Sequence, residues 1–169
     1  MSINIPSNST RRRRQRGSET IEAALITTIM FALIFLLLDI SLSLFIKVTL
    51  QEAVRDGVRY GVTEQLLTGD TYLSTSIAKV VQQNSGGFVS NAPCQVTVNY
   101  YDPYGGATTT PTGGYILQVA VQGYQYSPLG AIFKSGAPVS INVQASDVME
   151  ACPGAGCPSA VNPVPPTCP

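Results

Sequence analysis

Residues 18–48 read SETIEAALITTIMFALIFLLLDISLSLFIKV, and this stretch decides how the rest of the chain is arranged. Between Ala23 and Ile46 its polar members are Thr and Ser residues and Asp39, and it contains no Lys or Arg. At ~1.5 Å of rise per residue, a helix over 23–46 is ~36 Å long, which exceeds the ~30 Å hydrocarbon core of a bilayer. A core helix of a soluble protein is usually amphipathic, whereas this stretch is apolar on all sides. The sequence therefore predicts a transmembrane helix over about 23–46.

Basic residues are distributed unevenly around this helix. Five arginines precede it, and only Lys47, Arg55 and Arg59 follow closely. The excess of basic residues before a span keeps that side in the cytoplasm. We therefore expect residues 1–17 to be a basic cytoplasmic leader, with the part after the helix exported across the membrane. The arginines of the leader are Arg11, Arg12, Arg13, Arg14 and Arg16.

The charge balance excludes one class of partner. The ten basic and ten acidic residues cancel, but every acidic residue follows Gly17. A chain starting at Ser18 would carry five basic and ten acidic side chains, a net charge of −5. Nucleic-acid binding requires a basic face, so we expect no nucleic-acid partner.

The junction between the leader and the helix reads GSETIE, from Gly17 to Glu22. It resembles the class III signal of type IV prepilins, in which a membrane peptidase cuts after the Gly and leaves the helix in the chain. The resemblance implies a prepilin peptidase as a partner, cleavage between Gly17 and Ser18, and a role for Glu22 in subunit assembly. A carboxylate at the edge of the hydrocarbon is costly unless paired, and the new ammonium on Ser18 would lie one helical turn away. A secretory signal peptide fits less well, because the apolar run is too long and no A-x-A site follows it.

Two further features, spread over three later segments, narrow the family. Residues 50–61, LQEAVRDGVRYG, follow the pattern A-x-R-x-G-x-R-x-G, and residues 94–98 and 116–129 contain two short strand patterns and a Tyr-Ser-Pro corner. Together with the junction, these segments resemble the TadE-like pseudopilins of the Tad (type IVc) pilus, although Ala23 stands where Tad members usually have an aromatic residue. The resemblance implies a structural subunit that packs against other pilin subunits through its N-terminal helix. It also implies a minor subunit, because the small major pilins of this group resemble little more than the helix.

Beyond the span, the helix pattern is expected to run on, giving an N-terminal helix over 18–68. Val54, Val58 and Val62 repeat at helical spacing, and Thr68-Gly69-Asp70 then interrupts the pattern. Gly57 and Gly61 either mark a close contact of the helix with the sheet or only weaken the helix by ~1 kcal/mol each. A second helix is expected over Tyr72–Asn84, with its buried face formed by Leu73, Ile77, Val80 and Val81.

The hydrophobic period then changes from helical spacing to alternation. Residues 95–99, 115–126 and 139–146 each read as strands, and the Gly-, Thr- and Pro-rich stretch Asp102–Gly114 reads as a loop. We expect an α+β, pilin-like fold in which three or four antiparallel strands pack on the outer half of the long helix. The small exported domain would cover 69–150, followed by a Pro-, Gly- and Cys-rich tail over 151–169.

Asp39 lies ~26 Å beyond Glu22 along a helix, near the outer part of the span. Two roles stay open for it: contact with another subunit, for example with Lys47 of a second copy, or a locally hydrated acid with no partner. We therefore treat Glu22 and Asp39 as the candidate assembly residues.

Four cysteines lie on the side expected to be exported, where up to two disulfides can form in three pairings. The local pair Cys152 and Cys157 would leave Cys94 with Cys168. A zinc site fits less well, because the chain contains no His and the spacing is a poor match to metal-binding patterns.

No pattern in the sequence indicates catalysis. The chain has no His to serve as a base, no Gly-x-Ser-x-Gly, no phosphate-binding loop and no metal-ligand cluster. We therefore expect no catalytic residue, cofactor or metal, and a structural role. The alternatives are a single-pass membrane anchor whose outer domain is a binding or adhesin module, and an exported enzyme with an active site that the sequence does not reveal.

Overall fold

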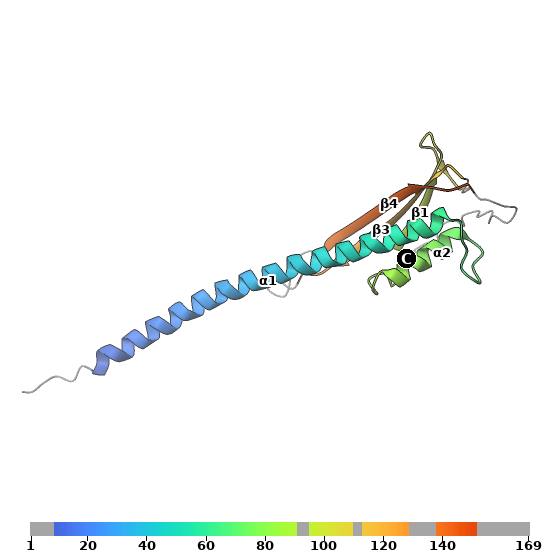
Figure 1. The fold of residues 1–169 in the computed structure, drawn as a ribbon. Coiled ribbons are helices and arrows are strands. Elements are labelled where there is room, and N and C mark those ends of the chain that lie inside the picture. The colour runs from blue at the N-terminus through green and yellow to red at the C-terminus, as the bar shows by residue number, and fades with distance from the viewer. Residues whose placement is uncertain (1–8, 91–94, 110–112, 129–137, 152–169) are drawn as a thin grey trace, which may run out of the picture.

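The computed structural model describes residues 9–90, 95–109, 113–128 and 138–151, and side chains from Ser18 onward. The chain has the predicted α+β fold, with a long N-terminal helix, a short second helix and an antiparallel sheet of four strands (Figure 1). The elements in order are α1 (Ser9–Val62), α2 (Leu73–Asn84), β1 (Val96–Tyr101), β2 (Ala107–Thr108), β3 (Ile116–Tyr126) and β4 (Val139–Val148).

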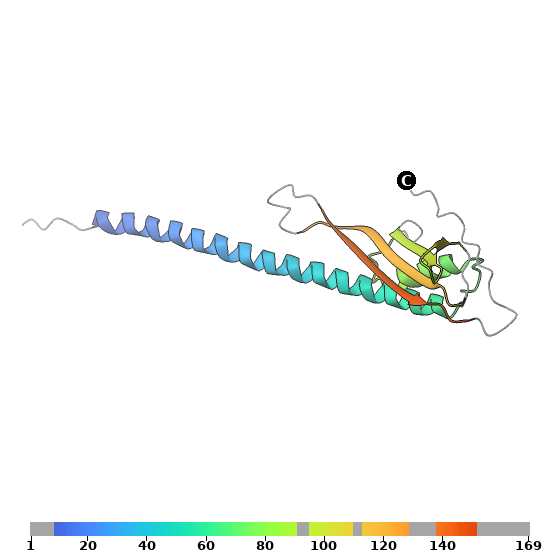
Figure 2. The same cartoon turned by 90° about the horizontal axis from the view of Figure 1, so that it is seen from above.

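Helix α1 is continuous, and its first part projects away from the domain formed by the other elements (Figure 2). The predicted bounds of 18–68 were wrong at both ends. The helix begins at Ser9, because the Arg and Gln residues of the leader are good helix formers. It ends at Val62, because Glu64 adopts a left-handed conformation with φ 53° and its N–H donates to the carbonyl of Gly61 at 3.1 Å. A left-handed residue commonly ends an α-helix in this way.

The sheet has the strand order β2-β1-β3-β4, and every pairing is antiparallel. Strand β2 lies inside the stretch Asp102–Gly114 that the sequence predicted to be a loop. Asp102 explains the difference: its carboxylate accepts hydrogen bonds from the N–H groups of Tyr104 and Gly106, at 2.9 and 2.6 Å. These bonds close a tight turn that brings Ala107 opposite Tyr101. Residue composition alone does not distinguish such a turn from an open loop.

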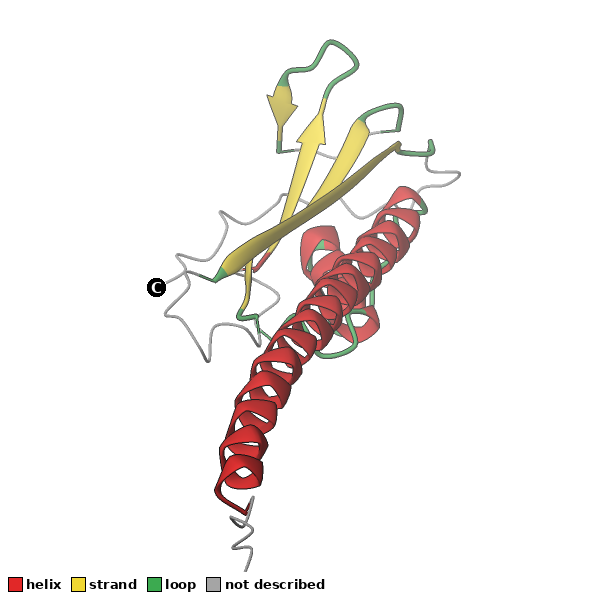
Figure 3. Ribbon diagram, turned by 90° about the vertical axis from the view of Figure 1, so that its left-hand side faces the viewer, coloured by secondary structure: helices red, strands yellow, loops and turns green. Residues whose placement is uncertain are grey.

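The core lies between the helices and one face of the sheet (Figure 3). Helix α1 packs over β3 and β4, and α2 packs against α1 and β1. The buried face of α2 includes Leu73, Ile77 and Val81 as predicted, while Val80 is half-buried. The largest fully buried side chains are Tyr100, Leu50, Leu73, Ile77, Leu117, Met149, Val54, Val81, Val89, Val119 and Val121.

Gly57 and Gly61 lie where α1 packs closely against other elements. Of the two interpretations offered for these glycines, the structure supports a close contact. A Cβ added at Gly57 would overlap Cγ2 of Val81 in α2. A Cβ at Gly61 would overlap Cδ2 of Leu117 in β3 and Cδ1 of Ile77 in α2. The predicted contact with the sheet is therefore confirmed for Gly61, which also contacts α2, and was wrong for Gly57, whose close neighbours all lie in α2.

Candidate membrane and assembly segment

The first part of α1 is an exposed apolar rod. Every side chain from Ser18 to Leu38 is exposed, and only 6 % of the most apolar window of this helix is buried. Among the described residues, one helix is long and apolar enough to cross a membrane, and it lies near the N-terminus. The low burial distinguishes this segment from the core helix of a soluble protein. The exposed apolar side chains include Ile21, Leu25, Ile29, Phe31, Leu33, Leu37 and Leu38.

Two hydroxyl groups in this part of α1, one within the rod and one just beyond it, are satisfied locally. Thr28 donates to the carbonyl of Ala24 at 2.8 Å, and Ser41 donates to that of Leu37 at 2.8 Å. Such bonds to the preceding turn remove the cost of placing a hydroxyl in hydrocarbon. These two hydroxyl groups therefore add little cost when this segment enters a bilayer.

The predicted processing residues lie at the start of the rod. Gly17 lies within the helical backbone of α1, and Ser18 and Glu22 are exposed one turn apart on the same helix. The spacing of four residues places the latter two on one face. An ammonium at Ser18, once formed, would therefore be near the Glu22 carboxylate. Cleavage after Gly17 and the role of Glu22 in assembly stay predictions.

Asp39 contacts the folded domain of its own chain. The hydroxyl of Tyr126, the last residue of β3, donates to Oδ1 of Asp39 at 3.2 Å. Burial and this hydrogen bond raise the pKa of the Tyr126 hydroxyl above its usual value. Contact of Asp39 with Lys47 of a second copy stays a prediction, but the structure now gives Asp39 an intramolecular partner. The sequence did not reveal this pair, because nothing distinguishes Tyr126 from the other tyrosines of the strands.

An aromatic cluster lies close to this contact. The rings of Phe45 and Phe88 meet edge to face with centroids 6.2 Å apart, and those of Phe88 and Tyr124 do so at 5.9 Å. Tyr124 is two residues before Tyr126 on β3. The cluster therefore ties α1 to the segment after α2 and to the end of the sheet nearest the exposed rod.

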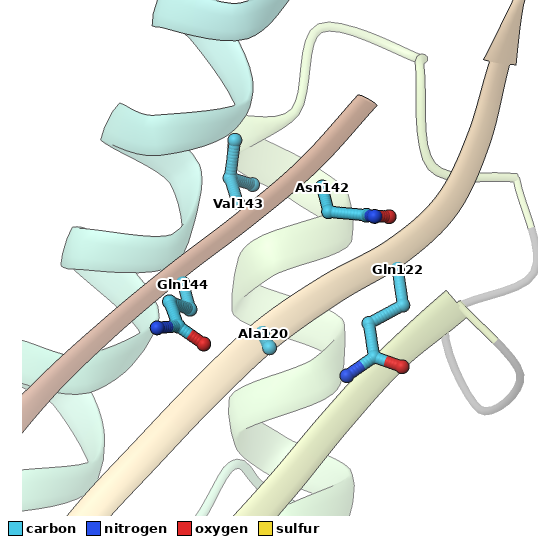
Figure 4. A pocket seen from close by; sticks show the side chains of 5 residues that line it. All are labelled: Ala120, Gln122, Asn142, Val143 and Gln144. Carbon is cyan, nitrogen blue, oxygen red and sulfur yellow. The ribbon is translucent and has the colours of Figure 1, made fainter. Parts of the chain in front are cut away.

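The other face of the sheet carries an open hollow lined by Ala120, Gln122, Asn142, Val143 and Gln144 (Figure 4). Its polar side chains are amides, which supply neither a nucleophile nor a general base. In residues 9–90 and the three described ranges after them, no three acidic side chains gather into a metal-binding group. The predicted absence of catalytic residues, cofactors and metals stays a prediction. The disulfide candidates Cys94, Cys152, Cys157 and Cys168 all lie outside the described residues.

Comparison with known proteins supports the resemblance found in the sequence. A family model described as TadE-like protein matches residues 17–59. The match begins at the glycine of the predicted junction and covers the exposed rod and most of its continuation beside the sheet. No curated protein and no solved structure matches the chain.

Proposed function

We propose that this chain is a minor pilin or pseudopilin-type structural subunit of a Tad-like (type IVc) pilus or secretion assembly. The observation that carries the proposal is the exposed apolar rod 18–38, which is continuous in one helix with a folded domain. The match of residues 17–59 to the TadE-like family supports it. A subunit of this kind acts by assembly and not by turnover.

The rod can exchange one apolar environment for another. In the inner membrane its side chains contact lipid, and in an assembly they would contact the rods of neighbouring subunits. Association of apolar helices is then driven by packing, because lipid tails are as apolar as the helices themselves. Small residues such as Ala23, Ala24 and Ala32 permit close approach between rods.

At the cytoplasmic end, the pairing of opposite charges would fix how far one subunit helix is shifted along the next. Removal of the leader creates an ammonium on Ser18 in place of five arginines. Glu22 of the same or a neighbouring subunit would neutralise it, which lowers the cost of holding a carboxylate at the edge of the hydrocarbon. Gly17 also weakens the helix by ~1 kcal/mol relative to Ala, and this eases the local unwinding that a peptidase needs.

The first test is the N-terminus of the mature protein. Intact mass and N-terminal sequencing of protein from its native host should show a chain that begins at Ser18. Gly17→Ala should abolish this cleavage and leave the full leader in place. A wild-type chain that keeps its arginines would overturn the processing step, and the membrane-anchored binding module would then be the better function.

The second test separates assembly from processing. Glu22→Ala should reduce incorporation into sheared surface filaments or into cross-linked complexes with other pilins, while membrane insertion is retained. Glu19→Ala is the matched control, since Glu19 is an exposed acid on the same helix one turn away. Equal incorporation of both variants would contradict the assembly role of Glu22.

A further inference from the structure

The membrane-proximal end of the sheet lies beside α1 at Asp39, well inside the range that hydropathy assigns to the span. Tyr126 contacts Asp39 at this end, and the N–H of Glu150 donates to the carbonyl of Val62 at the other, at 3.4 Å. Along α1 the distance from Asp39 to Val62 is ~35 Å, and β4 with its extension from Val139 to Glu150 is ~36 Å long. The sheet therefore follows α1 over the whole of 39–62.

This arrangement conflicts with a hydrocarbon core that reaches Ile46. Tyr126 and its partner Val139 would then lie within the hydrocarbon, together with the start of β4. Within the part of the chain that the structure describes, β4 is an edge strand, so one side of its backbone has no strand partner there. Open sheet edges do not occur in contact with lipid tails, because each unsatisfied peptide group costs several kcal/mol there.

We propose that the outer boundary of the hydrocarbon core lies at Asp39, and that the Asp39–Tyr126 end of the sheet rests on the lipid headgroups. A core of ~30 Å needs ~20 helical residues, which places the span at about 19–38 instead of 23–46. The inner boundary then falls beside the Gly17–Glu22 junction. The lipid surface is thus the partner of this end of the domain while the chain is in the membrane.

The side chains around the boundary have the chemistry of a headgroup layer. Tyr124 and Tyr126 present rings with a polar tip, which is the residue type enriched at membrane interfaces. The headgroup region is ~5–7 Å thick on each side, so it covers Asp39 to about Ser43 along the helix. Ser41 and Ser43 lie in this layer.

The depth of a chosen residue in the bilayer can be measured by Trp fluorescence. The chain contains no Trp, so a single introduced Trp is the only source of this signal. Ile21→Trp, Phe31→Trp and Phe45→Trp each place one fluorophore at an exposed position, the native side chains being 67, 52 and 61 % exposed. The full chain is reconstituted in phosphatidylcholine vesicles with brominated acyl chains, which quench Trp near the hydrocarbon. Phe31→Trp lies ~4–5 Å from the bilayer centre for either span, so it is the control for insertion.

The other two variants distinguish the spans. With a span of 19–38, Trp at position 21 is ~11 Å from the centre and Trp at 45 is ~25 Å from it. With a span of 23–46, these distances become ~20 and ~16 Å. We expect quenching at 45 to be at most about half of that at 21, since position 45 would lie beyond the ~15 Å half-thickness. Quenching at 45 equal to or greater than that at 21 would overturn the proposal.

Phe45 contacts Phe88, so Phe45→Trp could disturb the fold. A second Trp position controls for this. Val48→Trp replaces a side chain that is 56 % exposed and lies further from the proposed boundary. Its quenching should be weaker still than that of Phe45→Trp. Val48→Trp quenched as strongly as Ile21→Trp would reject the boundary at Asp39 independently of the Phe45 variant.

Discussion

At the residue scale, Asp70 holds the turn between the two helices. Its side chain is 5 % exposed, and it accepts a hydrogen bond from Ser76 at 3.0 Å and pairs with the ammonium of Lys79. Ser76 in turn accepts from the N–H of Leu67 at 3.1 Å. The carboxylate therefore connects the end of the α1–α2 turn to the first two turns of α2. This network satisfies polar groups that would otherwise be left without partners as the chain reverses.

The same network makes stability depend on pH. The hydrogen bond from Lys79 is the main cause that holds the pKa of Asp70 below 3.8, its usual value. Because the folded state binds the proton more weakly than the unfolded state, this stabilisation is present above about pH 4 and is lost as pH falls through the lowered pKa. We expect Asp70→Asn to lose about 1–2 kcal/mol at pH 7 and to show a flatter decline of stability in acid. Urea unfolding in detergent at a series of pH values measures both.

Asp147→Asn is the matched control, because Asp147 is exposed and, among the described residues, its carboxylate accepts a local hydrogen bond from the N–H of Val148. The free energy of unfolding of Asp147→Asn should decline with falling pH as that of the wild type does. If the unfolding free energy of Asp70→Asn fell with pH as steeply as that of the wild type, the role assigned to the Asp70 network would be contradicted.

At the scale of elements, α1 and α2 pack closely because Gly57 has no side chain. Replacing Gly with Ala in an exposed helix usually stabilises it by up to ~1 kcal/mol. Here the added methyl would overlap Val81, and overpacking of this kind costs about 1–3 kcal/mol. We expect Gly57→Ala to destabilise the wild-type domain but to be neutral or stabilising in a Val81→Ala background, where the overlapping methyl is gone. A double-mutant cycle by denaturant unfolding measures this change of sign, and additive effects would argue against the contact.

The elements also show what the sequence can and cannot predict. Helix α2 and strand β4 each depend on local periodicity, and their bounds lie within two residues of the predicted ranges 72–84 and 139–146. The end of α1 depends on one left-handed residue, Glu64, which has no sequence pattern of its own. Strand β2 depends on side-chain bonds within a turn, and the Asp39–Tyr126 contact joins residues 87 positions apart. The Asp39–Tyr126 contact follows from tertiary packing, whereas Glu64 and the Asp102 turn are local features that hydrophobic periodicity does not register.

At the scale of the molecule, the chain divides into a rod and a domain that share one helix. No described residue before Ile46 belongs to the hydrophobic core, whereas Ile46 and Leu50 are 5 and 0 % exposed. The rod therefore supplies an exposed surface, and the domain supplies the buried side chains that stabilise the fold. Under the proposed function, this division would let the environment of the rod change from lipid to neighbouring subunits while the core is unaffected.

This division predicts which truncations fold. A chain that begins at Asp39 keeps every described core residue and the contact with Tyr126, so we expect cooperative thermal unfolding and an unchanged sheet signal by circular dichroism. A chain that begins at Gln51 loses the buried side chains of Ile46 and Leu50, at about 2–5 kcal/mol each. That loss is comparable to the ~5–15 kcal/mol of a whole domain, so this chain should be largely unfolded. The full chain in detergent is the reference. If the Asp39 chain unfolded without cooperativity, the rod would be part of the folding unit, and extraction from the membrane would then have to disturb the domain.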